Sequence, residues 1–151
     1  MNRQQLLQKL DAAWLAFKQS YAGLSDAQLM QPGVTGEWSV RDIIAHVAWW
    51  EGEALKHLPL IRSGGRPARY STTYGGIDAF NAQMTELKGG LSLADVLAYQ
   101  EDTHRQLIDY LEHVSEDEFV RETRFRRRLK LDTYGHYPLH TAAIREWRAR
   151  S

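Results

Sequence analysis

The chain has 151 residues, of which 43% are apolar and 25% are charged, and these values predict a single folded domain spanning residues 1–151. Lysine plus arginine and aspartate plus glutamate each number 19, so the net charge gives no reason to expect nucleic acid or an anionic membrane as a partner. The absence of cysteine excludes disulfides, thiolate metal ligands and a cysteine nucleophile. We expect a cytoplasmic protein, because the start of the chain lacks a signal-peptide pattern and no apolar run approaches the ~18 residues of a membrane-spanning helix.

The N-terminal region has the pattern of an amphipathic helix. Asn2 is a suitable N-cap, and Gln5 stands where a side chain can bond back to the cap. Apolar residues then recur three or four positions apart, which predicts one face buried in a core. These residues are Leu6, Leu7, Leu10, Trp14, Phe17, Tyr21 and Leu24. Turn-forming residues at positions 32–36 separate this region from the next helix.

A second helix is predicted from Val40 to about Leu58, with Pro59 marking its end. Its N-terminus has a strong capping signal, because the Ser39 hydroxyl can accept from the free backbone N–H groups of the first turn. His46 lies beside the apolar face of this helix. The helix is therefore expected to direct the His46 imidazole toward the interior of the protein.

The region after the second helix contains a connection and a shorter helix. Residues 61–73 are a mixture of Gly, Pro and Arg with other types, and we expect a surface loop that overhangs a site. The shorter helix is predicted from Ile77 to about Leu87. Asn81 lies inside it, and two interpretations are open: a hydrogen-bonding role, or an exposed side chain without one.

Two further long helices complete the predicted fold. Apolar periodicity and a Ser92 cap predict the third over residues 93–114, and the last is predicted over Thr133–Arg148. No segment shows a convincing alternating strand pattern. The sequence therefore predicts an all-α four-helix bundle with one or two short extra helices.

A local excess of positive charge lies before the last helix. The segment from Arg121 to Lys130 contains five Arg and one Lys but only one Glu. Three interpretations are open: a solvated face, a wall that binds an anion, and a nucleic-acid footprint. The segment lacks the aromatic interleaving, and the chain lacks the overall basicity, that are typical of nucleic-acid binders. We therefore expect no nucleic-acid partner.

Three of the six histidines form a candidate metal site. His136 and His140 are four residues apart, so on a helix they lie on one face and can bind one divalent metal. His46 is the natural third ligand because of its expected interior position. Three neutral nitrogens with an open position suit Zn, Ni or Fe, and the sequence does not choose among them. A chance spacing without metal is the alternative.

Pro138 bears on this geometry, because proline is favoured in the first turn of a helix. If the last helix starts at Tyr137, His136 lies outside it and the pair is expected to lose its geometry. If the helix starts near Thr133, both histidines belong to it. His104, on the third long helix, is expected to be a hydrogen-bonded core or groove histidine.

Glu53 is the candidate catalytic carboxylate. It follows His46 by seven residues and approximately shares its side of the second helix, so it is placed to act as a general base or as an outer-shell partner of a metal ligand. An exposed glutamate without a role is the alternative. The sequence contains no phosphate-binding loop, dinucleotide fingerprint or nucleophile elbow.

Three segments of the chain resemble the DinB-like superfamily and, within it, the ClbS/DfsB group. They are Gly36–Glu51, Ile77–Asn81 and Tyr134–His140 together with Trp147. The resemblance extends from about Leu6 to Trp147. It implies a four-helix bundle with histidines on the second and fourth helices, and it implies the same three histidines as ligands of a divalent metal.

The resemblance also implies chemistry on small molecules. The superfamily includes transferases and isomerases that use low-molecular-weight thiols, and the colibactin-resistance member of the nearer group is similar to a hydrolase of an electrophilic cyclopropane. We therefore expect a metal-assisted hydrolase or thiol transferase that acts on an electrophilic small molecule in detoxification or self-resistance. Two alternatives remain: a non-enzymatic bundle that binds or sequesters a small molecule, and a protein whose site has lapsed.

The expected substrate groove combines an apolar wall with the basic segment. Trp38, Trp50 and Tyr137 are expected to line the wall. Arg124 and Arg126 are expected to hold an anionic substrate or cosubstrate. We expect no membrane partner, and the sequence leaves a symmetric homodimer open.

Overall fold

The computed structural model describes all 151 residues and consists of nine helices with no extended strand. The helices are α1 Arg3–Ser20, α2 Asp26–Leu29, α3 Val40–Arg62, α4 Tyr70–Thr73, α5 Ile77–Lys88, α6 Leu93–Glu112, α7 Asp117–Val120, α8 Arg124–Asp132 and α9 Tyr137–Arg150. The predicted all-α class is confirmed. The N-caps predicted at Asn2 and Ser39 are both present, each as a capping box, at the starts of α1 and α3.

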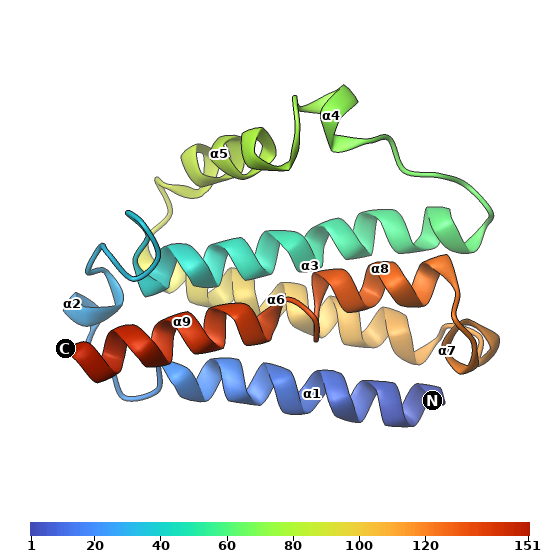
Figure 1. Ribbon diagram of the computed structural model, residues 1–151, viewed down its shortest axis with the longest axis horizontal. Helices are drawn as coiled ribbons and strands as arrows, with labels where there is room; N and C mark the ends of the chain where they lie inside the picture. The colour runs from blue at the N-terminus through green and yellow to red at the C-terminus, as the bar shows by residue number, and fades with distance from the viewer.

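The long helices form a bundle in which two short helices share one position. Figure 1 shows α1, α3 and α6 side by side with α8 and α9, which lie end to end, while α4 and α5 lie outside the bundle along α3. The most extensive packing joins α3 to α6, α3 to α8, and α1 to α9. The fourth member of the bundle is therefore divided: its first half packs on α3 and its second half on α1.

The division between α8 and α9 depends on a close backbone contact. The Gly135 N–H donates to the Lys130 carbonyl at 2.8 Å, and the Tyr137 N–H donates to the Thr133 carbonyl at 2.9 Å. A Cβ on residue 135 would lie 2.7 Å from the Lys130 oxygen, so the turn requires a glycine. The prediction of one helix beginning at Thr133 is wrong, because the chain turns here before α9 begins.

The basic segment forms most of α8, which the sequence analysis did not identify as a helix. Its N-cap is Thr123, whose hydroxyl accepts from the Arg126 N–H at 3.0 Å. Phe125 and Leu129 are four residues apart and fully buried. The segment is therefore amphipathic: its apolar face packs into the bundle, and its cations are exposed or part-buried.

The second helix is longer than predicted, since α3 continues through Pro59 to Arg62. Proline removes only one donor, the N–H that would bond one turn back, and its position close to the C-terminus limits the damage. The Pro59 carbonyl itself accepts from the Ser63 N–H at 3.2 Å. The prediction that Pro59 ends this helix is therefore wrong.

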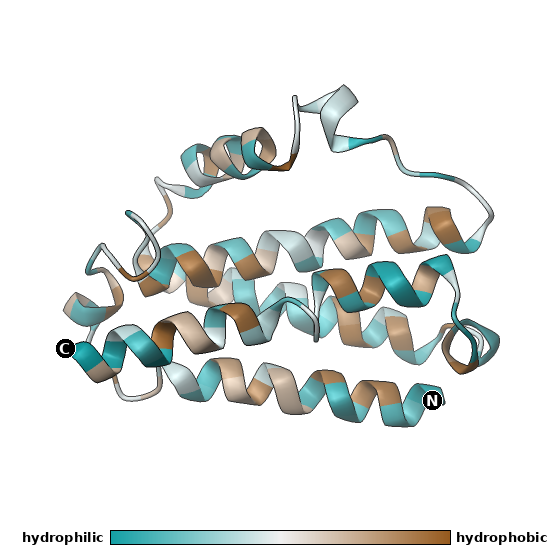
Figure 2. Cartoon of the chain, viewed as in Figure 1, coloured by the Kyte–Doolittle hydropathy of each residue, from teal (hydrophilic) through white to brown (hydrophobic).

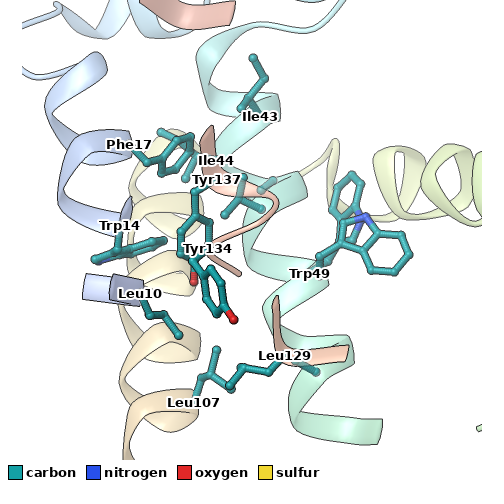
Figure 3. Close-up of a cluster of buried hydrophobic side chains, with 14 of the residues drawn as sticks. Leu10, Trp14, Phe17, Ile43, Ile44, Trp49, Leu107, Leu129, Tyr134 and Tyr137 are labelled. Carbon is teal, nitrogen blue, oxygen red and sulfur yellow. The ribbon is translucent and has the colours of Figure 1, made fainter. Parts of the chain in front are cut away.

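The core is centred on aromatic residues. Figure 3 shows Tyr137 next to Phe17 and Trp14 of α1, with ring centroids 6.4 and 5.4 Å from that of Tyr137. In the same view Trp49 leaves α3 on another side, where the yellow-green ribbon of α5 lies. α3 therefore contributes aromatic side chains to two regions, the bundle core and the space under α5.

Apolar and polar residues are interspersed along every long helix (Figure 2). This pattern is that of helices with one buried face and one exposed face. None of the helices combines the length and the apolar character that crossing a bilayer requires.

Candidate metal centre

Three histidines from two separate parts of the chain meet between α3 and the start of α9. The His136 Nε2 lies 3.1 Å from the His46 Nε2 and 2.9 Å from the His140 Nε2. One ring nitrogen from each histidine lies within 4.8 Å of the others. His46 is in the second turn of α3, where the capped start of the helix fixes its direction. The structure therefore brings together the three residues that the sequence pattern selected.

The start of α9 does not disrupt this arrangement, although α9 begins at Tyr137, the start that was expected to leave His136 outside the helix and to separate the two histidines. α9 begins at Tyr137 with Pro138 in its first turn, and His136 is the N-cap. His136 nevertheless has helix-like dihedral angles, with φ −103° and ψ −47°. Because the backbone path from His136 to His140 remains close to helical, the two imidazoles stay on one face. The expectation that this start would separate them is wrong.

The local environment keeps all three imidazoles neutral. Burial lowers the pKa of His46 to about 2, with further lowering from the neighbouring His140 and His136. Burial likewise lowers the pKa of His136 to about 3, with a contribution from His140, and that of His140 to about 4. A neutral imidazole has the free lone pair that a metal ion requires, whereas an imidazolium has none.

Aromatic packing holds the His46 ring. The centroids of Trp38 and Trp49 lie 4.7 and 5.1 Å from that of His46. The Nδ1 atoms of His46 and His136 are buried and have no hydrogen-bond partner within the chain. Metal-binding histidines usually have their second nitrogen held by a carboxylate or carbonyl, so in this protein ring orientation relies on packing instead.

His46 and His136 open onto a cavity of about 380 Å³ between α3, the α4–α5 segment and α8. Its lining residues are His46, Trp50, Tyr70, Ile77, Asn81, Arg128, Leu131, Asp132 and His136. The connection predicted to overhang a site therefore contributes to one, through Tyr70 in α4. A larger hollow between α1 and α6 contains none of these histidines.

A chain of polar contacts forms one wall of the cavity. The Tyr70 hydroxyl donates to Glu53 at 3.0 Å and accepts from Arg128 at 2.7 Å. Arg128 Nε donates to Asp132 at 2.7 Å. Burial raises the pKa of Asp132 to about 6, against the opposing effect of Arg128. The Glu53 Oε1 also lies 3.4 Å from the His57 Nε2. Glu53 thus stands behind Tyr70 and is not a lining residue.

The residues predicted to form the groove have different positions in the structure. Trp50 lines the cavity, and Trp38 packs on His46. Tyr137 does not contribute to the groove, because it is fully buried and its hydroxyl donates to Glu51 at 2.7 Å. Arg124 and Arg126 also lie elsewhere.

Backbone carbonyls hold both of these arginines away from the cavity. Arg124 donates to the Gly65 carbonyl, and Arg126 donates to the Phe119 carbonyl, each at 3.2 Å. Arg128 is the arginine of the basic segment that reaches the cavity. A run of five arginines does not reveal which one faces inward, but the four-residue spacing of Arg128, Asp132, His136 and His140 was a usable signal.

A second buried polar cluster was not identified from the sequence. Glu51 is fully buried, and its Oε2 contacts the His104 Nδ1 at 2.6 Å as well as the Tyr137 hydroxyl. The His104 ring stacks on Trp14 with centroids 3.8 Å apart. His104 is thus a hydrogen-bonded histidine, as expected. Glu51 is a core residue that ties α3 to α6 and α9.

The donor set fits a divalent metal better than it fits hydrogen bonding alone. A neutral imidazole Nε2 has either one proton or one lone pair, yet the His136 Nε2 faces two other Nε2 atoms. A single hydrogen bond cannot serve both partners well. Nitrogens that share an ion at ~2.0–2.1 Å lie about 3 to 3.5 Å apart, close to the two separations in this site.

Comparison with known proteins identifies the family. The family model described as the DinB superfamily matches residues 9–143. No curated protein sequence gives a significant match. Among solved structures, the chain is similar to DfsB, described as a sibling lethal factor precursor, with a TM-score of 0.80 and 16% identity over 99% of this chain and 96% of that one.

Two other solved structures share the fold. An uncharacterised protein from Escherichia coli UTI89 has a TM-score of 0.81 and 14% identity, over 99% of this chain and 94% of that one. The colibactin self-resistance protein ClbS, solved in complex with double-stranded DNA, has a TM-score of 0.79 and 14% identity, over 96% and 94%. The prediction of no nucleic-acid partner is wrong as an exclusion, because this fold is found bound to DNA. Net charge averages over the whole chain and does not describe a local basic surface.

Proposed function

The chain belongs to the DinB superfamily, and from this premise we propose that it is a metal-assisted hydrolase or thiol transferase that acts on an electrophilic small molecule. The observation that carries the proposal is the position of the His136 Nε2, 3.1 and 2.9 Å from the Nε2 atoms of His46 and His140. Similarity to a colibactin self-resistance protein supports a role of the detoxification type.

The residues of the site have two proposed roles, as metal ligands and as the lining of the cavity that would hold the substrate, here called the substrate chamber. The three histidines would hold the metal, since they are neutral and their nitrogens converge. A bound divalent ion would lower the pKa of a water or low-molecular-weight thiol toward neutrality and so supply a nucleophile. Trp50 and Tyr70, with ring centroids 5.3 Å apart, provide an apolar aromatic surface beside the ligands.

Charge inside the chamber is confined to one wall. Arg128 is the cation that lines the cavity, and Asp132 partly neutralises it. Glu53 is best assigned a positioning role, because it accepts from the Tyr70 hydroxyl and does not reach the cavity itself. The sequence suggested Glu53 as a general base, but we propose instead that Glu53 holds Tyr70 in place.

Metal titration tests the first half of the proposal. Protein purified without a metal-affinity tag is stripped with EDTA and titrated with Zn, Ni, Mn and Fe by calorimetry, with melting temperature as a second readout. We expect one equivalent to bind. His140→Ala should weaken binding by more than the roughly 10–100-fold that loss of an outer-shell partner costs, whereas the exposed His113→Ala should bind normally. No binding and no thermal shift with any metal would refute the metal site.

Turnover tests the second half. The metal-loaded protein is incubated with styrene oxide, with and without glutathione, and products are followed by chromatography. Metal-dependent hydrolysis supports the hydrolase, and metal-dependent conjugation supports the transferase. One equivalent of metal without turnover of this and related electrophiles would instead favour a binding or sequestering protein.

A further inference from the structure

Asn81 of α5 is fixed by two neighbouring tryptophans of α3. Its side-chain oxygen accepts from the Trp49 Nε1 at 3.1 Å and from the Trp50 Nε1 at 3.0 Å. Trp49 and Trp50 are 2% and 8% exposed. Asn81 is itself half-buried and lines the cavity onto which His46 and His136 open.

The chemistry of the indoles determines which end of the amide remains free to bind a ligand. An indole N–H is a donor only, so the atom that faces both tryptophans must be the amide oxygen. An amide oxygen has two lone pairs, and both are engaged in this contact. The Asn81 Nδ2 has no hydrogen-bond partner within the chain and is not among its buried unpartnered atoms. This amide can therefore serve a ligand only as a donor.

The donor is held rigidly. The Trp50 ring packs on Phe80 and Tyr70 with centroid separations of 5.2 and 5.3 Å, and the Trp49 ring packs on Trp38 at 6.2 Å. Rotating the Asn81 amide would break two hydrogen bonds and place its NH2 group against two N–H donors. A donor that is fixed before binding loses little entropy when a ligand arrives.

Of the other polar groups that line the cavity, Arg128 has the same bias, whereas the neutral imidazoles of His46 and His136 and the carboxyl group of Asp132 can accept. The Arg128 guanidinium is also a donor only, and Asp132 already accepts from it. A ligand hydroxyl at Asn81 could accept from the amide, but the Asn81 side chain has no free acceptor for the hydroxyl proton, and a buried unpaired donor is unfavourable. A carbonyl oxygen only accepts, so it meets the amide without that cost.

We propose that Asn81 is a specificity-determining donor, and that the molecule bound in this cavity carries a carbonyl oxygen on a flat apolar body. The oxygen accepts from the Asn81 NH2 group, and the body lies against Trp50 and Tyr70. The description of this molecule as an electrophilic substrate rests on the proposed function. Its binding through Asn81 requires no metal.

The experiment uses metal-free protein and three probes with closely matched carbon frameworks. Acetophenone has a carbonyl oxygen, 1-phenylethanol has a hydroxyl, and ethylbenzene has neither. Binding is followed by two-dimensional NMR of the Asn81 side-chain amide and the indole N–H groups. In the wild-type protein we expect acetophenone to bind more tightly than either other probe and to shift the Asn81 amide signals, which ethylbenzene should leave in place.

Asn81→Asp is the matched variant. A carboxylate keeps an oxygen for both indoles but replaces the NH2 group by an acceptor. We expect the Kd for acetophenone to rise roughly tenfold, in line with the loss of one hydrogen bond and the gain of a repulsive contact, and the Kd for ethylbenzene to stay within about twofold. An equal change for both probes, or an unchanged Kd for acetophenone, would overturn the proposal.

Two features keep the test decisive. If Asn81→Asp does not fold, the wild-type comparison still decides, because shifts of the Asn81 amide by ethylbenzene and acetophenone alike would refute a carbonyl-specific contact. Because the titrations contain no metal, failure of the metal centre leaves their outcome unchanged. Failure at Asn81 in turn leaves the metal titrations with the histidine variants unaffected.

Discussion

Gly135 controls the turn that delivers His136 to the cavity, and Gly135→Ala is the change that tests this. The Cβ of an alanine would lie 2.7 Å from the Lys130 oxygen and 3.1 Å from its Cγ. Ordinary contact begins at 3.4 Å, so the two segments must separate by about 0.7 Å. The side-chain carbon can move aside, but the backbone oxygen also accepts the Gly135 N–H at 2.8 Å, and separation weakens that bond.

The expected cost follows from these contacts. Loss of one hydrogen bond costs about 0.5–1.5 kcal/mol, and overpacking costs about 1–3 kcal/mol. Alanine lowers the conformational entropy of the unfolded chain, and this offsets up to about 1 kcal/mol of the loss in stability. The free energy of unfolding should therefore fall by about 0.5–4.5 kcal/mol. Because His136 directly follows the displaced residue, metal affinity should fall by at least about tenfold, in the range found when a ligand loses its support.

Urea denaturation of the metal-free protein and calorimetric metal titration measure the two effects. Gly52→Ala in α3 is the matched control, since a Cβ there meets no atom within 4 Å. Alanine is the better helix former, so this control should be more stable by about 0.5–1 kcal/mol, with unchanged metal affinity. A Gly135→Ala protein that matches the wild type in both measurements would refute the role assigned to the turn.

Two further predictions concern buried groups. Folding keeps His46, His136 and His140 neutral below their ordinary pKa of 6.5, whereas the unfolded chain takes up protons there. The free energy of unfolding of metal-free protein should thus decrease as pH falls from 7 to 5, by at most about 1.4 kcal/mol per pH unit per histidine. Urea denaturation at several pH values should show that this free energy depends less steeply on pH in His140→Gln than in the wild type. An equal dependence on pH in the two proteins would contradict the lowered pKa values. Tyr137→Phe removes a donor to the buried Glu51. The free energy of unfolding measured in urea should fall by about 1–3 kcal/mol, and the Kd for acetophenone should not change. Weaker acetophenone binding with unchanged stability would instead indicate that Tyr137 lines the groove.

The local signals of the sequence predicted local structure well. The capping boxes at Asn2 and Ser39 and the interior direction of His46 follow from side chains within one turn of each other. Such features depend on helix geometry alone, so neighbouring elements do not change them. The convergence of His46 with the C-terminal histidines was predictable for a related reason, since both sites lie on inward faces of adjacent helices.

Features that depend on tertiary packing were not predictable in the same way. Tyr137 has an aromatic ring beside a candidate ligand, which suggested a groove residue, yet its hydroxyl finds the buried Glu51. Pro59 is a helix breaker by composition, yet its place near the end of α3 makes it tolerable. The inward arginine of α8 was not selected because the helix itself had not been recognised, and without helical phase every arginine in the run is equivalent.

The divided fourth helix gives these separate findings one physical basis. Arg128, Asp132, His136 and His140 follow one another at intervals of four residues. On one straight helix each interval turns the side chain by about 40°, so the stripe would drift by roughly 120° from first to last. The turn at Gly135 interrupts that drift. α8 packs on α3 with Arg128 and Asp132 at the cavity, and α9 starts after its N-cap His136, so that His136 and His140 both lie beside His46. A glycine without a functional group is thus expected to determine whether the cavity wall and the candidate metal ligands belong to one site.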